Sequence, residues 1–245
     1  MEWGGHTRVG AGADVEGLPP LDKRPPVRLK DLVAMAEACN ASSAAEVAVF
    51  ATATFAFFAM CRLGELTVRT ASKPDPFRAR WADCAEEASG GISSVLVHFP
   101  RDKTHANDGF DRVAAEQRRM PTFCPVAAVR RHRLLNALAP GEAATAWGAF
   151  SYRIGSDAGA RRELTSSFFT RTVNGWLAAG GRPPVSGHCF RIGGATLYFA
   201  AKKPLADIQL RGGWESDTYL IYIRDNHIRH AAIFGDIDPA GLYYG

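Results

Sequence analysis

The sequence predicts a mainly α fold with one small antiparallel β-sheet, and three features of the 245-residue chain support this class. Residues 47–61 form an uncharged apolar run, which is the pattern of a buried helix. Residues 94–99 are rich in β-branched side chains and lie between Gly and Pro residues, as a strand does. From Cys124 onward, apolar residues recur at helical spacing.

Local signals place the elements of the first half. Residues 1–27 are rich in Gly, Pro and charge and show no period, so we expect a disordered leader there. A helix follows from about Leu29 to Cys39, and Ser42-Ser43 caps the apolar helix that ends near Arg62. The other expected elements are a short helix near residues 64–66, a strand over 77–81, an acidic turn over 86–91 and a third strand near 112–120.

Four helices and a helical tail are expected in the second half. Pro125 suits the first turn of the first of these helices. The apolar face of that helix carries Val126, Val129, Leu134 and Leu135. The remaining segments cover residues 166–179, 186–201, 204–210 and 215–232.

Composition narrows the class of partner. The net charge is +4 and the pI about 8.9, which permits a nucleic-acid partner without requiring one. The five cysteines are scattered and form no CxxC pair, which argues against a disulfide framework or a zinc site and fits a reducing compartment. The run at 47–61 is shorter than the about 20 residues of a membrane span, and no signal peptide precedes it, so no membrane partner is expected.

Two stretches of the second half carry groups that bind and attack a phosphate. His188 and Arg191 are three residues apart and share one face of the predicted helix. Trp214 follows, and Tyr222 lies eight residues after it. An arginine fork binds phosphate oxygens in pairs, and a tyrosine becomes a nucleophile once its proton, of ordinary pKa about 10, is removed.

Further groups suited to phosphodiester chemistry lie upstream. Arg62 ends the apolar helix and is followed by Glu65 and Leu66, while Lys103 comes directly after the strand expected over residues 94–99. A second arginine can share the charge of the phosphate, and a lysine can protonate a leaving oxygen.

These residues, in this order, resemble the active site of the tyrosine recombinases, phage-integrase-like enzymes that cut and rejoin DNA through a phosphotyrosine. The resemblance covers about residues 25–230. Its motifs are Arg-x-x-Glu-Leu at 62–66, His-x-x-Arg at 188–191, and Gly-Gly-Trp with a later Tyr at 212–222. The last stretch is most similar to recombinases of Crypton-type eukaryotic mobile elements.

The resemblance implies DNA recombination or integration without metal, ATP or another cofactor. It implies a supporting role for Glu65 and catalytic roles for Arg62, Lys103, His188, Arg191, Trp214 and Tyr222. Double-stranded DNA is the implied partner, residues 223–245 are expected to dock on a second copy of the chain, and the location implied is the nucleus. The family places a helical core-binding domain before the catalytic domain. Because only a short irregular stretch precedes the first helix here, we expect residues 28–245 to be a catalytic domain alone.

Alternatives stay open at this stage. Tyr219 lies three residues before Tyr222 on the same helix face and is a rival nucleophile. Four arginines either contact the DNA backbone or form a solvated surface, namely Arg101, Arg130, Arg131 and Arg224. For the whole chain, the alternatives are a domesticated mobile-element domain that binds DNA without catalysis, a type IB topoisomerase-like relaxase, and a helical interaction domain.

Overall fold

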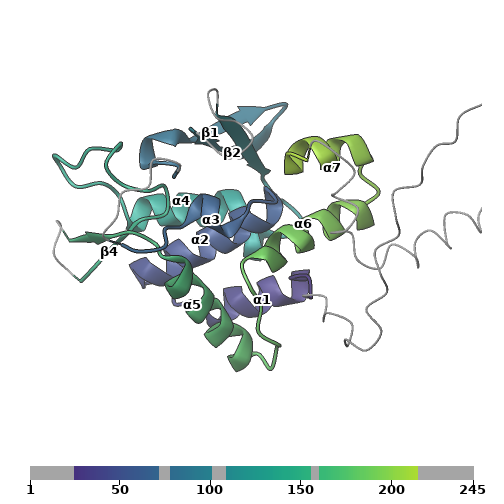
Figure 1. Cartoon of the computed structure of the whole chain (residues 1–245), viewed down its shortest axis with the longest axis horizontal. Coiled ribbons are helices and arrows are strands. Elements are labelled where there is room, and N and C mark those ends of the chain that lie inside the picture. The colour runs from purple at the N-terminus through teal and green to yellow at the C-terminus, as the bar shows by residue number, and fades with distance from the viewer. Residues whose placement is uncertain (1–24, 72–77, 101–108, 156–159, 215–245) are drawn as a thin grey trace, which may run out of the picture.

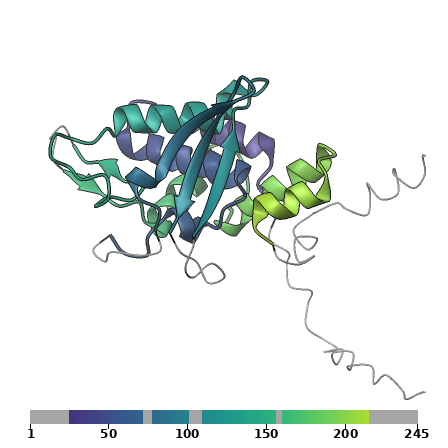
Figure 2. The ribbon, with the colours of Figure 1, turned by 90° about the horizontal axis from the view of Figure 1, so that it is seen from above.

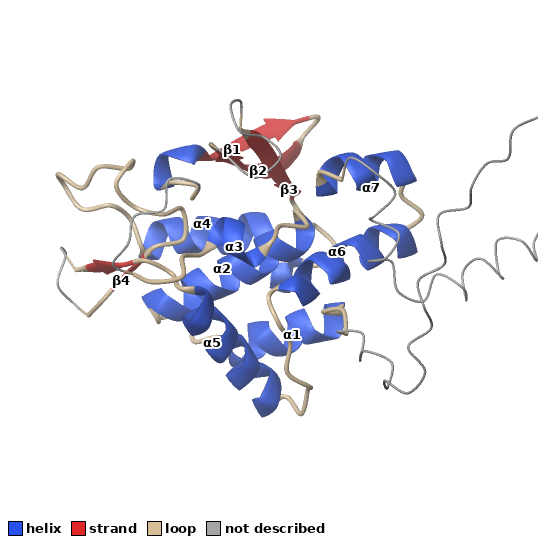
Figure 3. Cartoon of the chain, viewed as in Figure 1, coloured by secondary structure: helices blue, strands red, loops and turns tan. Residues whose placement is uncertain are grey.

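The computed structural model describes residues 25–71, 78–100, 109–155 and 160–214, and helices outweigh strands in it (Figures 1 and 3). The elements in chain order are α1 (Leu29–Ala38), α2 (Ala44–Phe58), α3 (Leu63–Leu66), η1 (Trp81–Asp83), β1 (Cys84–Ser89), β2 (Ile92–Phe99), β3 (Phe110–Ala115), η2 (Pro121–Phe123), α4 (Pro125–Leu135), β4 (Tyr152–Arg153), β5 (Arg161–Arg162), α5 (Ser166–Ala179), α6 (His188–Ala200) and α7 (Leu205–Gly212). The predicted class is confirmed.

Helix α2 lies at the centre of the fold, where α1, α4, α5 and α6 all contact it (Figure 1). Nearly all side chains of residues 47–58 are buried, since none carries a charge that must stay in water. The hydroxyls of Thr52 and Thr54 donate to carbonyls of their own helix, which satisfies the polar side chains of this run. The Ser43 hydroxyl accepts from the backbone N–H of Glu46 and caps the helix, as predicted.

A three-stranded antiparallel sheet of order β1-β2-β3 packs against α4 and α2 (Figure 2). Val95, Val97 and Phe99 of β2 are buried, which confirms the strand expected over residues 94–99. Gly90 and Gly91 join β1 to β2 with φ values of 57° and 73°, the signature of a two-residue type I′ hairpin.

Two expectations for the front of the sheet are wrong. In place of a strand over residues 77–81, Arg80 makes an isolated bridge and the 3₁₀ turn η1 follows. The acidic turn expected over residues 86–91 is mostly strand β1. Because β1 is an edge strand with only Cys84 buried, its sequence lacks the alternation that identifies a half-buried strand.

The later helices lie close to their predicted positions. Helix α5 covers the predicted residues 166–179, and the bounds of α6 and α7 differ from the predicted ones by no more than two residues. The third strand, β3, begins two residues before the expected range and ends within it. The expectation that Leu134 of α4 faces the core is wrong, because this side chain is 80% exposed.

Helix α6 approaches α2 closely because glycines face its neighbours. A Cβ on Gly194 would lie 2.0 Å from the carbonyl oxygen of Phe57, and one on Gly193 would lie 2.2 Å from that of Val27. The N–H of Val27 donates to the carbonyl of Cys189 at 3.0 Å, which ties the start of the described chain to α6. The glycine pair therefore permits the close packing of α6 on its neighbours.

The five cysteines are all free. Within the described ranges, no helix is long and apolar enough to cross a membrane. Over the same residues, no group of three or more His, Cys, Asp or Glu side chains is arranged to hold a metal ion.

A neutral histidine is built into the core beside α4. His132 is fully buried, its Nε2–H donates to the Ala149 carbonyl at 3.1 Å, and its Nδ1 accepts from the Asn136 amide at 3.1 Å. Both ring nitrogens are therefore satisfied without a charge. Burial lowers the pKa of His132 to about 4.

We expect the free energy of unfolding to fall as the pH drops from about 7 towards 4. In this window the unfolded chain, where His132 has its ordinary pKa of 6.5, binds a proton that the folded chain excludes. The contribution of neutral His132 to the free energy of unfolding is complete above pH 6.5. The part of it that is lost reaches about 3 kcal/mol near pH 4. Urea unfolding across this range measures it, with His132→Gln, which does not titrate, as the control. A wild-type profile parallel to that of the variant would contradict the expectation.

We expect Gly194→Ala to destabilise the protein by about 1–3 kcal/mol, since the added methyl group overlaps a backbone carbonyl. Gly175→Ala is the matched control within a helix. A Cβ there would meet no atom within 4 Å, so alanine should stabilise by about 0.5–1 kcal/mol. Chemical denaturation measures both changes, and effects of the same sign would argue against the close packing of α6 on α2.

Candidate functional site

The guanidinium of Arg191 lies between the ends of two helices. The residue is 1% exposed, its Nη1 donates to the Met60 carbonyl at 2.6 Å, and its Nη2 donates to the Gly212 carbonyl at 2.8 Å. Its Cζ lies 4.2 Å from the ring centroid of Trp214, within the range of a cation–π contact. Arg191 of α6 therefore joins the turn after α2 to the end of α7.

The turn after α2 is shaped to present the Met60 carbonyl. Met60 has a φ of 51°, a left-handed conformation that costs free energy for a residue with a side chain. The Phe58 carbonyl accepts from the Tyr198 hydroxyl at 2.7 Å. Two carbonyls at this helix end, which the helix itself leaves unpaired, are thus bound by side chains of α6, Tyr198 and Arg191.

The conformation at the end of α7 depends on two glycines, Gly212 and Gly213. A Cβ on Gly212 would lie 1.6 Å from the ring of Trp214, so the ring packs across a position that no side chain can share. Gly213 has a φ of 61°, and its N–H donates to the Leu210 carbonyl at 3.0 Å. The Trp214 N–H donates to Gln209 at 3.1 Å, which fixes the aromatic residue against the last turn.

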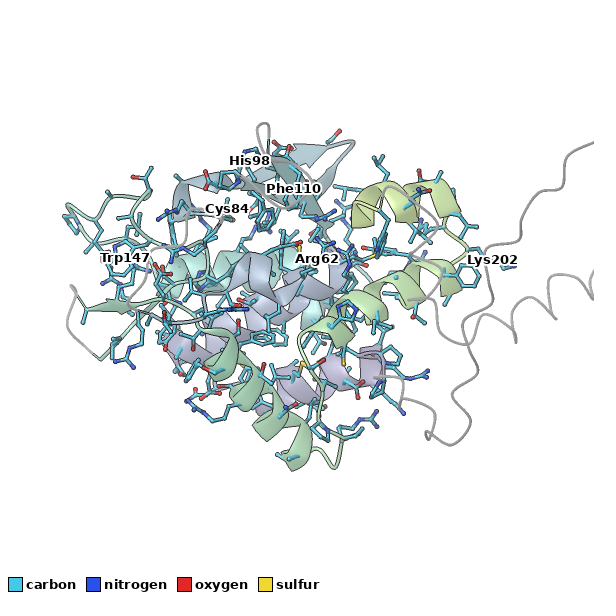
Figure 4. The ribbon with its side chains drawn as sticks, viewed as in Figure 1. Arg62, Cys84, His98, Phe110, Trp147 and Lys202 are labelled. Carbon is cyan, nitrogen blue, oxygen red and sulfur yellow. The ribbon has the colours of Figure 1, made fainter. Side chains whose placement is uncertain are left out.

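Arg62 begins the short helix α3, as its N-cap, and does not belong to α2 as the sequence suggested. One Glu65 oxygen accepts from the backbone N–H of Arg62 at 3.0 Å, and the other accepts from its guanidinium at 3.1 Å. The Arg62 side chain is 53% exposed. In Figure 4 Arg62 lies near the centre of the molecule, below Phe110 of the sheet in that view. Glu65 therefore holds this exposed cation in place.

His188 is the first residue of α6, one turn before Arg191, and is half-buried. The preceding Gly187 lets this helix start lie against α3, because a Cβ there would be 2.4 Å from Leu63. Since Leu63 follows Arg62 directly, two motifs that are far apart in the sequence lie side by side.

Positive charge gathers around Arg191. Burial lowers the pKa of Arg191 to about 10, Glu65 opposes this shift, and the neighbouring Arg112 and Arg62 add to it. The guanidinium keeps its charge at neutral pH. Among the described residues, the charged groups that act on it are Arg62 and Arg112, with Glu65 as the one carboxylate. A cluster with this excess of positive charge favours a bound anion, and the planar guanidinium groups of its arginines match the spacing of phosphate oxygens.

The sequence prediction missed Arg112. It lies on β3 and is buried on the same face as Ala114, and its Nη1 donates to the Arg211 carbonyl at 2.8 Å. The signal that identifies it is the period of two over residues 110–115, which puts an arginine at an inward-facing position of a strand.

Five predicted candidates lie outside the described residues, namely Arg101, Lys103, Tyr219, Tyr222 and Arg224. Two of the arginines predicted to touch the DNA backbone lie on α4, away from the Arg191 cluster. Arg130 pairs with Glu86 of β1 at 2.9 Å, and the Arg131 guanidinium donates to the Ala41 carbonyl at 2.6 Å. Neither Glu86 nor Ala41 belongs to a segment that supplies a residue of the Arg191 cluster.

No protein-family model and no curated protein sequence matches this chain. Its structure is similar to that of XerA recombinase, with a TM-score of 0.55 and 15% identity, over 90% of this chain and 67% of that one. It is also similar to XerH site-specific recombinase bound to palindromic difH substrate in a post-cleavage complex, with a TM-score of 0.53 and 14% identity over 89% of this chain. This chain spans 55% of the XerH chain. The fold is that of tyrosine recombinase catalytic domains.

We expect Arg191→Lys to destabilise the protein by about 2–3 kcal/mol. An ammonium lacks the planar fork that reaches two carbonyls, so one buried carbonyl loses a charged partner. Arg62→Lys is the control. Its exposed ion pair contributes little, and the change should stay within about 0.5 kcal/mol. Guanidinium chloride unfolding measures both, and a loss at Arg191 no larger than that at Arg62 would refute the bridging role.

Proposed function

We propose that this protein cleaves and rejoins DNA strands in site-specific recombination, through a 3′-phosphotyrosyl intermediate and without metal or ATP. One observation carries the proposal. Arg62, the N-cap of α3, lies close enough to Arg191 of α6 for its charge to act on that guanidinium, and Trp214 after α7 packs on the same guanidinium, although the chain separates the three residues widely. Packing alone does not explain why these three residues are the same ones that the recombinase motifs contain. The similarity of the fold to XerA recombinase supports the same conclusion.

The first task of the site is to hold the scissile phosphate. In the proposed reaction, Arg62 and Arg191 bind its non-bridging oxygens, while His188 and Trp214 assist. The two carbonyl contacts use two of the five N–H donors of Arg191 and fix its orientation before the substrate arrives. Charge that is already oriented stabilises a transition state without reorganisation. Glu65 does the same for Arg62 by holding both its backbone and its side chain.

The second task is covalent exchange. The phenolate oxygen of Tyr222 attacks phosphorus, an O–P bond forms, and the bond from phosphorus to the 5′ oxygen breaks. Lys103 gives that oxygen its proton, so that cleavage leaves a free 5′-hydroxyl. The 5′-hydroxyl of another strand then attacks the phosphotyrosine, its proton passes back to Lys103, and the phenolate of Tyr222 is released. Each step exchanges one phosphoester for another, so no external energy source is needed.

Three finer proposals depend on the resemblance of the sequence to eukaryotic mobile-element recombinases. We assign the chain to the Crypton-type group on the Gly-Gly-Trp stretch at residues 212–214, and we place its activity in the nucleus. We also propose that residues 223–245 dock on a second copy on DNA. Light scattering of the DNA complex tests the docking, and one chain per DNA molecule would contradict it.

Covalent trapping tests the reaction. The protein is incubated with nicked suicide duplexes of varied sequence, denatured, and analysed for a protein–DNA adduct. We expect an adduct with the wild type and none with Tyr222→Phe, because the variant keeps the ring and loses the nucleophilic oxygen. DNA binding by Tyr222→Phe should stay within about twofold of the wild type, since one hydroxyl group adds little to a phosphate-dominated interface.

Tyr219→Phe is the matched control and should still form the adduct. Loss of the adduct with Tyr219→Phe alone would move the nucleophile to that residue. Salt-sensitive binding without any adduct would favour a domesticated DNA-binding domain. Relaxation of supercoiled plasmid without strand exchange would favour a topoisomerase-like relaxase.

A further inference from the structure

Arg112 is a buried cation that none of the proposed catalytic steps uses. It is 4% exposed, although a strand of a small sheet offers many positions at which an arginine could reach water. Its Nε is buried and has no hydrogen-bond partner in the part of the chain that the structure describes. A buried unsatisfied donor on a charged group costs free energy, so its position calls for a reason beyond packing.

The guanidinium of Arg112 lies at the end of α7, beside the turn that holds Trp214. Its Nη1 donates to the Arg211 carbonyl at 2.8 Å, and the next carbonyl, that of Gly212, accepts from Arg191. A Cβ on Gly213 would lie 2.7 Å from both Nη atoms of Arg112. Two arginines from different elements are therefore held side by side by consecutive carbonyls at a helix C-terminus, where partial negative charge favours cations.

Among the residues that the structure describes, the charges around this pair do not balance. Arg112 lies close enough to Arg191 to disfavour its charged form, as Arg62 also does, and Glu65 is the carboxylate that opposes them. Two carbonyls carry only partial charges. Keeping three guanidinium groups together is unfavourable by itself, and a bound dianion or phosphodiester relieves the repulsion.

We propose that Arg112 is a third arginine of the phosphate site, held at the end of α7 so that its charge acts on the same anion as Arg62 and Arg191. The inference deepens the proposed function and rests on it for the identity of the anion as a DNA phosphate. The binding of a phosphate as such can be tested without any DNA chemistry.

The first experiment uses inorganic phosphate as the probe. The melting temperatures of the wild type, Arg112→Lys and Arg112→Gln are compared in phosphate and in chloride at equal ionic strength. Gln keeps an N–H donor for the Arg211 carbonyl but no charge, whereas Lys keeps the charge. We expect phosphate to raise the melting temperature of the wild type more than chloride does. The Arg112→Lys variant should keep most of this extra shift, and the Arg112→Gln variant should lose it.

Arg118→Gln is the control, because Arg118 follows the same strand but is an exposed arginine paired with Glu116. It should keep the wild-type shift. The absence of a phosphate-specific shift in the wild type would overturn the proposal, whether or not the variants fold. An unchanged shift in Arg112→Gln, or equal loss in the Lys and Gln variants, would overturn it too, since the role would then not depend on charge.

The second experiment uses a duplex whose cleavage position the trapping assay has identified. We expect Arg112→Gln to bind this duplex about tenfold more weakly than the wild type, as loss of one charged contact predicts. Replacing the scissile phosphate by a neutral methylphosphonate should shrink that difference to about twofold or less. An equal difference on both duplexes would contradict the proposal. If phosphate stabilises the protein through Arg112 but no duplex is ever cleaved, the result supports the anion site and contradicts the proposed recombinase function.

Discussion

The arrangement depends on one buried cation that lies between two helix ends. Arg191 crosses from α6 to the Met60 carbonyl beyond α2 and to the Gly212 carbonyl at the end of α7. Burying a guanidinium away from water is costly unless hydrogen bonds and opposing charge compensate it. Both acceptors are carbonyls at helix C-termini, where the peptide dipoles concentrate negative charge. The helix ends and the cation therefore stabilise each other.

Other features of the chain follow from this contact. The left-handed Met60 turns its carbonyl towards α6, and Gly194 lets α6 come close enough to α2 for the side chain to reach it. At the other end, Gly212 leaves space for the Trp214 ring beneath the guanidinium. Strain and small residues are thus concentrated where three elements meet. The same contacts that hold the helices together also orient a charge towards the proposed phosphate, so the fold and the site cannot be altered separately.

The sequence predicted the elements whose pattern is local. Helix α5 was located correctly because its apolar residues keep a helical period. Strand β1 was missed because an edge strand with acidic residues shows no alternation. In the candidate site, the motif residues come from the resemblance, whereas Arg112 was missed because the period of two that places it inward begins at Phe110, before the expected strand. The partners of Arg191 are backbone carbonyls, which any residue type supplies, so no pattern of side chains could have indicated them.

The most direct test is a crystal structure of the protein with a nicked DNA duplex. The central claim is that dispersed residues form one site for one phosphate. The account predicts a single phosphate of the DNA within hydrogen-bond distance of both Arg62 and Arg191, with Trp214 packed against the Arg191 guanidinium. It would be contradicted by a complex in which DNA phosphates lie only on the arginines of α4, while Arg191 binds its two carbonyls and contacts no DNA.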